Sequence, residues 1–129
     1  MTRIMINLND ISYNIRKACF EIHNKLGLGL LESVYEAILA YKLHEMGYNV
    51  RTQVPIPVIY ENIKLDIGFR VDLLVEDVII IELKSVENLH PVHSKKLLTY
   101  LRLANKKLGL LINFNSISID KESFIRIIN

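Results

Sequence analysis

The middle of the chain combines two carboxylates with an ammonium group, in Asp72, Glu82 and Lys84. Glu82 and Lys84 directly follow the apolar run 78–81, where charged groups are costly to bury unless they are paired. On a strand these two residues share one face, and the backbone carbonyl of Leu83 lies between them. Two carboxylates and a carbonyl form a hard oxygen site suited to Mg²⁺ or Mn²⁺. A lysine beside the metal helps to deprotonate an attacking water or stabilises charge on a phosphate, so these residues favour phosphodiester hydrolysis.

Whether Asp72 reaches Glu82 depends on the hairpin that joins their strands. A two-residue loop at 76–77 puts Asp72 on the face of the sheet opposite Glu82, and the site then fails. A three-residue loop at 75–77 pairs Arg70 with Glu82 and puts Asp72 diagonally beside Glu82 on one face. The chemistry therefore predicts a bulged or odd-length hairpin.

The elements that must position these residues follow from hydrophobic periodicity. Apolar residues at helical spacing predict helices over about 9–26 and 30–46, and Pro91 opens a third helix over about 91–104. From Val50 the period changes to two, which indicates strands, and the run 78–81 is apolar on both faces as in a central strand. The remaining expected strands are 63–73, 108–112 and an outer one at 124–128. This order predicts an α/β fold with a mixed central sheet flanked by helices.

Composition limits the class of protein. The chain has 129 residues, half of them hydrophobic, which suits a single domain over 1–129 with a real core. Its longest apolar runs are about five residues, far short of the roughly 18 that span a bilayer, so we expect no membrane segment. Cys19 is the only cysteine, which excludes internal disulfides and thiolate metal clusters. Residues 1–7 contain no secretory signal, and we expect the protein in the cytoplasm.

Charge is distributed unevenly along the chain, although the formal net charge is only +2. Residues 1–84 hold nine Lys or Arg against eleven Asp or Glu, a net charge of −2. Residues 85–129 hold seven against three, a net charge of +4. Two interpretations remain open, a weak phosphate-facing surface and a solvated helix face.

Two sets of residues resemble known motifs. Asp72 followed by Glu82-Leu83-Lys84 resembles the Asp…(Asp/Glu)-x-Lys signature of the PD-(D/E)XK nuclease superfamily, with Val71 in place of the proline. The segment 29–35 resembles the Gly-x-x-Glu-x-x-Tyr pattern of the GxxExxY family, a small bacterial and archaeal group placed in that superfamily. The resemblance continues through the segments 53–55, 70–75, 97–101 and 110–114. It implies a restriction-endonuclease-like αβββαβ core and metal-dependent nuclease activity.

The resemblance also implies a role for each signature residue. The metal ligands that it implies are Asp72, Glu82 and the Leu83 carbonyl. Lys84 would serve the attacking water. A carboxylate from the first core helix is a further expected ligand, and Glu32 is the first candidate, with Glu36 four residues later as the second.

Four other residues are candidates for contact with the substrate. Tyr100 fits the Gln-x-x-x-Tyr pattern of RecB-type relatives, but Lys96 stands at the position of the glutamine. A lysine at that position can still contact DNA through a phosphate group. Arg70 shares the polar face of its strand with Asp72, and either binds phosphate or neutralises the carboxylates. Gln53 alternates with apolar neighbours and either touches substrate or lies on the surface of an edge strand.

The leading interpretation is a Mg²⁺-dependent nuclease that attacks DNA with a metal-activated water. The rival is a non-catalytic module that keeps the nuclease fold and binds nucleic acid or another protein. A third possibility, a junction resolvase, predicts a stable dimer. A 14.9 kDa core of low net charge binds DNA weakly alone, so we expect a homodimer or a partner protein.

Overall fold

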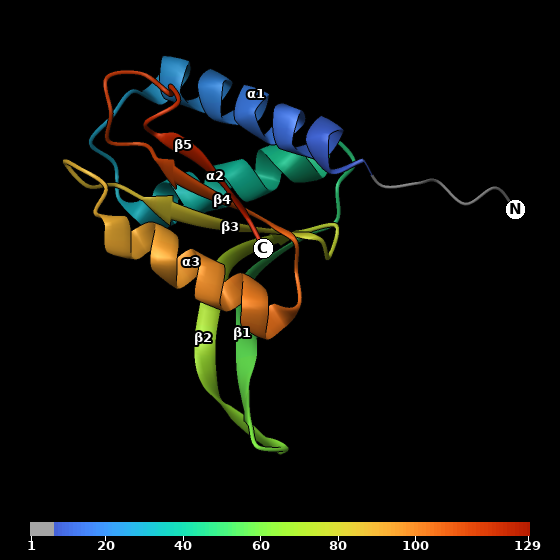
Figure 1. The fold of residues 1–129 in the computed structure, drawn as a ribbon. Coiled ribbons are helices and arrows are strands. Elements are labelled where there is room, and N and C mark those ends of the chain that lie inside the picture. The colour runs from blue at the N-terminus through green and yellow to red at the C-terminus, as the bar shows by residue number, and fades with distance from the viewer. Residues whose placement is uncertain (1–6) are drawn as a thin grey trace, which may run out of the picture.

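The computed structural model describes residues 7–129, apart from the side chain of Ile67. Two helices cover one face of a sheet and a third helix covers the other (Figure 1). The elements in chain order are α1 (Leu8–Leu26), α2 (Glu32–Glu45), β1 (Val50–Tyr60), β2 (Ile63–Val75), β3 (Ile79–Lys84), α3 (Pro91–Ala104), β4 (Leu108–Asn113) and β5 (Phe124–Ile128). This is the predicted α/β order, with helix and strand ends within a few residues of those expected.

The sheet has five strands in the order β1-β2-β3-β4-β5. The pair β3–β4 is parallel and the other three pairs are antiparallel, so the sheet is mixed as predicted. The parallel pair requires a crossover connection, and α3 supplies it. The predicted central strand therefore lies in the middle of the sheet.

Two hydrophobic cores lie on opposite faces of the sheet. On β3, the side chains of Ile79 and Ile81 pack in the core beneath α1 and α2, while Ile80 packs beneath α3. This alternation explains why the whole run is apolar. Leu97 and Leu101 anchor α3 and are fully buried, so truncating either one to alanine should destabilise the fold by about 2–5 kcal/mol.

The helix ends follow ordinary capping chemistry. Asn7 caps α1, because its Oδ1 accepts hydrogen bonds from two backbone N–H groups of the first turn. Gly47 follows α2 with a φ of 95°, a conformation that favours glycine. At α3, His90 and His93 form a reciprocal capping box around Pro91, the residue at which this helix was predicted to begin. Among the described residues, none of the helices is long and apolar enough to span a bilayer.

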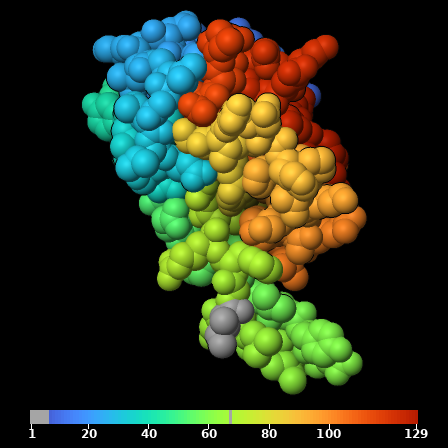
Figure 2. Space-filling model, turned by 90° about the vertical axis from the view of Figure 1, so that its left-hand side faces the viewer, coloured from blue at the N-terminus to red at the C-terminus, as the bar shows by residue number. Residues whose placement is uncertain are grey.

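The β1–β2 hairpin continues beyond the body of the molecule as a two-stranded arm, residues 57–68 (Figures 1 and 2). The register shifts at the base of the arm, between Ile56 and Val58. A Cβ atom at Gly68 would lie 1.9 Å from the carbonyl oxygen of Ile56, so only glycine fits there. β1 is an edge strand, where its two prolines, Pro55 and Pro57, are tolerated because proline donates no ladder hydrogen bond.

Candidate functional site

The hairpin between β2 and β3 sets the register of the candidate site. Val75 pairs with Ile79, so the loop has three residues, 76–78, and the predicted odd-length hairpin is confirmed. Its first two residues, Glu76 and Asp77, both have a positive φ, 53° and 57°.

The register within this hairpin differs from the one expected. The pairing of Arg70 with Glu82 was wrong, because Leu73 pairs with Ile81 and the same register sets Asp72 opposite Glu82. The reason is that Val75 is fully buried and stays in the ladder instead of entering the loop. The two carboxylates are therefore direct cross-strand neighbours.

Asp72 and Glu82 bind each other's strands through their side chains. The backbone N–H of Asp72 donates to Glu82 Oε1 at 3.3 Å, and the backbone N–H of Leu83 donates to Asp72 Oδ2 at 2.8 Å. Regular pairing of β2 with β3 ends one residue earlier, at Leu73 and Ile81. Carboxylates thus replace the backbone ladder where the two strands separate.

The carbonyl of Leu83 faces the same opening. On the other side of β3, the carbonyl of Lys84 accepts a hydrogen bond from the N–H of Phe114, beyond the end of β4. Because successive carbonyls alternate in direction along a strand, the Leu83 carbonyl points away from β4 and toward Asp72. It is available as a ligand beside the two carboxylates.

These groups line a pocket of about 430 Å³ between the start of α2 and the ends of the strands. Its wall consists of Leu31, Glu32, Ser33, Glu36, Gln53, Asp72, Glu82, Leu83 and Lys84. The three signature residues and the Leu83 carbonyl therefore come together at one place, as do Glu32 and Gln53.

The pocket disfavours the charged form of two of its carboxyl groups, those of Glu82 and Glu36. Burial raises the pKa of Glu82 well above its ordinary value, the charge of Asp72 raises it further, and Lys84 offsets only part of the shift. Burial also raises the pKa of Glu36, against a hydrogen bond from Gln53, and Asp72 again adds to the rise. A cation in this pocket would relieve both shifts.

The donor set fits a hard divalent cation. In residues 7–129 no group of three or more His, Cys, Asp or Glu side chains gathers at metal-binding spacing, so the side-chain ligands here would be two carboxylates. A metal here would be held by Asp72, Glu82 and the Leu83 carbonyl, with water in the remaining positions. Mg²⁺ commonly binds in this way, through one or two carboxylates and several waters.

Helix α2 contributes two glutamates to the wall, in different situations. Glu36 accepts a hydrogen bond of 2.7 Å from Gln53 Nε2, and its charge interacts with that of Asp72. Glu32 is exposed, and within the described part of the chain its carboxylate makes no hydrogen bond or ion pair. The sequence singled out Glu32 before Glu36, although their spacing of four residues already put both on one helix face.

The other predicted substrate contacts lie outside the pocket wall. Arg70 is exposed and its guanidinium donates to the carbonyl of Gln53 at 3.3 Å. Tyr100, on α3, packs against Phe69 with ring centroids 4.7 Å apart, and the charges of Glu82 and Asp72 add to a rise in its pKa caused first by burial. Lys96 is an exposed residue of the same helix. Their contact with substrate stays a prediction.

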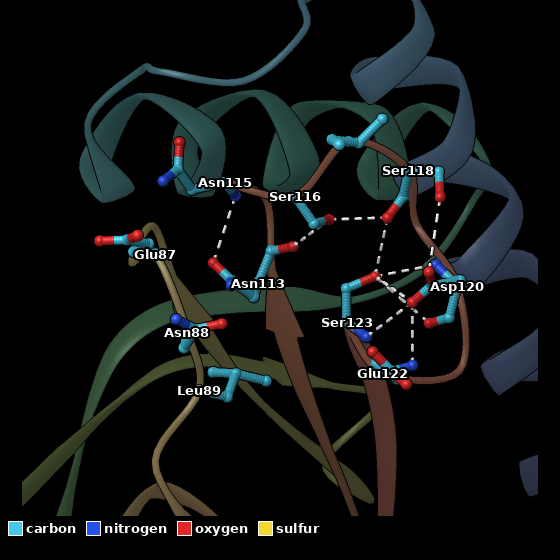
Figure 3. A pocket seen from close by; sticks show the side chains of 11 residues that line it. Glu87, Asn88, Leu89, Asn113, Asn115, Ser116, Ser118, Asp120, Glu122 and Ser123 are labelled. Carbon is cyan, nitrogen blue, oxygen red and sulfur yellow. Dashed lines mark hydrogen bonds between the residues drawn. The ribbon is translucent and has the colours of Figure 1, made fainter.

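A second polar pocket, of about 440 Å³, lies beside the loop that joins β4 to β5 (Figure 3). The carboxylate of Asp120 accepts hydrogen bonds from the backbone N–H groups of Glu122 and Ser123, at 2.9 and 3.1 Å. These bonds lower the pKa of Asp120. Asn113 binds both the N–H and the carbonyl of Val86. The polar groups of this pocket hold the surrounding loops in place. No sequence motif had indicated these residues.

The mixed sheet, its flanking helices and the carboxylates at the end of the central strand define a restriction-endonuclease-like fold. The family model of the PD-(D/E)XK nuclease superfamily matches residues 9–127, and the chain belongs to this superfamily. Nucleases of the superfamily generally use divalent metals. No curated protein and no solved structure matches the chain.

Proposed function

We propose that this chain is a Mg²⁺- or Mn²⁺-dependent nuclease that hydrolyses phosphodiester bonds, with DNA as its substrate. The observation that carries the proposal is the pairing of Asp72 with Glu82, in one pocket with Lys84 and short of positive charge. Membership of a nuclease superfamily supports it. The segment 29–35 supports assignment to the narrower GxxExxY group, and we expect the protein to act in the cytoplasm.

The roles follow from the positions of the side chains. Asp72, Glu82 and the Leu83 carbonyl hold the cation. When bound, the cation polarises the phosphate and lowers the pKa of a bound water. Lys84 lines the same wall and orients that water or stabilises charge that develops on the phosphate. Glu36 lines the same pocket and interacts electrostatically with Asp72.

Charge on α3 supports a nucleic acid as the substrate. Between Glu87 and Asp120 the chain has no acidic residue, and its lysines and arginine there are Lys95, Lys96, Arg102, Lys106 and Lys107. A polyanion lying along α3 would release counterions from its phosphates, and its affinity would fall steeply with salt. We expect the phosphate backbone to approach the pocket from this side.

The arm, residues 57–68, supports a homodimer. It exposes the large apolar side chains of Ile59, Tyr60, Ile63 and Leu65, and an isolated two-stranded ribbon is marginally stable in water. Its charged residues, Glu61, Lys64 and Asp66, sum to −1, which attracts no polyanion and repels a second copy only weakly. Light scattering should show a dimer that Ile63→Lys dissociates. A wild-type monomer at about 100 µM would contradict the dimer.

Direct observation of the metal is the first test of the nuclease. Crystals soaked in Mn²⁺ should give an anomalous peak held by Asp72, Glu82 and the Leu83 carbonyl. Cleavage of single-stranded DNA, duplex DNA, branched DNA and RNA is then measured with Mn²⁺ present, with Asp72→Asn as the inactive control. Preference for branched junctions by a dimer would support the resolvase alternative.

The rival, a non-catalytic binding module, predicts the opposite result. Binding of nucleic acid or protein without metal, no anomalous peak in an accessible pocket, and unchanged behaviour of Asp72→Asn would together replace the nuclease with the binding module. The replacement of the RecB-type glutamine by Lys96 is the feature that favours this rival. Against it stand two carboxyl groups side by side in a half-buried pocket, a costly arrangement that a purely structural protein has no stability reason to keep.

A further inference from the structure

Gln53 has an unusual backbone conformation in the middle of an edge strand. Its φ is 50°, in the left-handed region, where glycine and asparagine are common and glutamine is not. On either side of it, Thr52 pairs with Leu73 and Val54 pairs with Val71, but the ladder omits Gln53 and Asp72. Such strain persists only where the surrounding structure holds it, and it clusters at functional sites.

The side chain of Gln53 connects two carboxylates of the pocket. Its Nε2 donates to Glu36 Oε1 at 2.7 Å and to Asp72 Oδ1 at 3.4 Å. Both partners are carboxylates, so the nitrogen of the amide must face them, and its two N–H groups are committed. Arg70 holds the carbonyl of the same residue. An amide used in this way has no N–H left for a substrate.

Asp72 is consequently held at both of its oxygens. Gln53 binds Oδ1, and the backbone N–H of Leu83 binds Oδ2 at 2.8 Å. The first bond reaches Asp72 from β1 and links it to Glu36 on α2, while the second links it to β3. Three separate elements therefore fix a carboxylate that would otherwise swing away from Glu82.

We propose that Gln53 is a positioning residue, which ties Asp72 to Glu36 and so holds the Asp72 carboxylate beside Glu82 in the geometry that binds the cation. The inference rests on the proposed function. Partners that orient metal ligands typically contribute 10–100-fold to metal affinity. The left-handed turn at Gln53 is what allows one amide to reach both carboxylates, since a regular strand residue would direct its side chain straight out from the sheet.

Substitution by glycine separates the amide from the backbone. Gln53→Gly keeps the left-handed conformation and removes only the side chain, so the strand can still turn out of the ladder. Asn62→Gly is the matched control, because Asn62 also has a positive φ, 71°, and lies at the tip of the arm. Both variants gain the same backbone freedom in the unfolded state.

Two measurements read the effect. The first is Mn²⁺ affinity by calorimetry, which we expect Gln53→Gly to weaken about tenfold while Asn62→Gly leaves it unchanged. The second needs no metal: it is hydrogen exchange at the Leu83 amide, whose acceptor is Asp72 Oδ2. A looser Asp72 should raise this exchange rate about tenfold in Gln53→Gly alone.

The outcomes separate this inference from the proposed function. Unchanged or tighter Mn²⁺ binding by Gln53→Gly, with wild-type exchange at Leu83, overturns the positioning role and leaves the nuclease proposal intact. Failure of the wild type to bind Mn²⁺ overturns the proposed function. In that case faster exchange in Gln53→Gly would still support the positioning of Asp72, and unchanged exchange would overturn it.

Discussion

Two polar pockets in the described part of the chain, one beside the β4–β5 loop and one at the end of β3, are nearly equal in size and both contain carboxylates, but they act oppositely on the pKa of a carboxyl group. In the pocket beside the β4–β5 loop, backbone N–H groups lower the pKa of Asp120. In the pocket at the end of β3, burial and a neighbouring carboxylate raise the pKa of Glu82. Local hydrogen bonds stabilise the charged form of Asp120 in the first pocket, whereas the surroundings of Glu82 in the second pocket disfavour its charged form.

Sequence distance explains this difference. The bonds of Asp120 reach residues two and three positions away, so one turn supplies them. The groups around Asp72 come from α2, β1 and β3, and the bond from Gln53 to Glu36 spans 17 residues. The charges of a pocket assembled from distant elements do not stabilise any one turn or helix end. Uncompensated charge that the whole fold brings together is therefore the better guide to function.

Metal binding should show the largest difference between the pockets. Asp72→Asn removes one of two ligand carboxylates, and we expect Mn²⁺ affinity to fall by at least about 100-fold with loss of cleavage. Asp120→Asn should leave Mn²⁺ affinity and cleavage unchanged and should lower only the melting temperature. Calorimetry and thermal unfolding measure both variants. An equal loss of Mn²⁺ affinity in the two variants would remove the distinction between the pockets.

Removing a carboxylate from each pocket should change the free energy of unfolding in opposite directions. Glu82→Gln keeps an acceptor for the N–H of Asp72 and removes a charge that burial and Asp72 both oppose. We expect the free energy of unfolding to rise by about 1 kcal/mol or more at about pH 9, where the wild-type carboxyl has lost its proton. Urea unfolding measures it. Asp120→Ala, which removes acceptors from two backbone N–H groups, should instead destabilise the protein, and a stabilised Asp120→Ala would contradict the contrast.

The pH dependence of stability should separate the two carboxyls further. A raised pKa means that folded Glu82 holds its proton above 4.5, its ordinary value, while the unfolded chain has lost it. Stability therefore falls as pH rises from 4.5 through the raised pKa, and the fall should be shallower in Glu82→Gln. The lowered pKa of Asp120 acts in the other window, since its stabilisation is lost as pH falls below 3.8. Urea midpoints across the pH range test both, and equal slopes in wild type and Glu82→Gln would contradict the assignment.

Hydrophobic periodicity and turn residues were enough to predict the helices and strands. Pro91 and the apolar spacing after it gave the bounds of α3, and the unbroken run in β3 indicated a strand between two cores. The prediction for the β2–β3 hairpin was correct only in that its loop has an odd number of residues. It depends on whether Val75 pairs or turns, and that is decided by burial of its side chain beneath the helices.

The site was predictable where strand alternation controls it and unpredictable where the helix meets the sheet. Glu82, Leu83 and Lys84 follow one another on one strand, so their relative directions were known from the sequence. Gln53 gave no such signal, because a glutamine carries little preference for a left-handed backbone and its partners lie on other elements. Only tertiary packing reveals that its amide faces Glu36 and Asp72.

The smallest expected effect concerns a lysine near each pocket. Burial lowers the pKa of His93, and the charges of Lys84 and Lys96 lower it further, so Lys96 on α3 acts on the same residue as the lysine of the candidate site. Lys121 instead lies in sequence between Asp120 and Glu122, which line the pocket beside the β4–β5 loop. Lys96→Ala should weaken DNA binding a few-fold and reduce the slope of log affinity against log salt by about 1, because one phosphate contact is lost. Lys121→Ala should change neither quantity. Fluorescence anisotropy with labelled duplex at several salt concentrations measures both. Equal slopes for Lys96→Ala and wild type would move the path of the phosphate backbone away from α3, while leaving the carboxylates as the place where hydrolysis occurs.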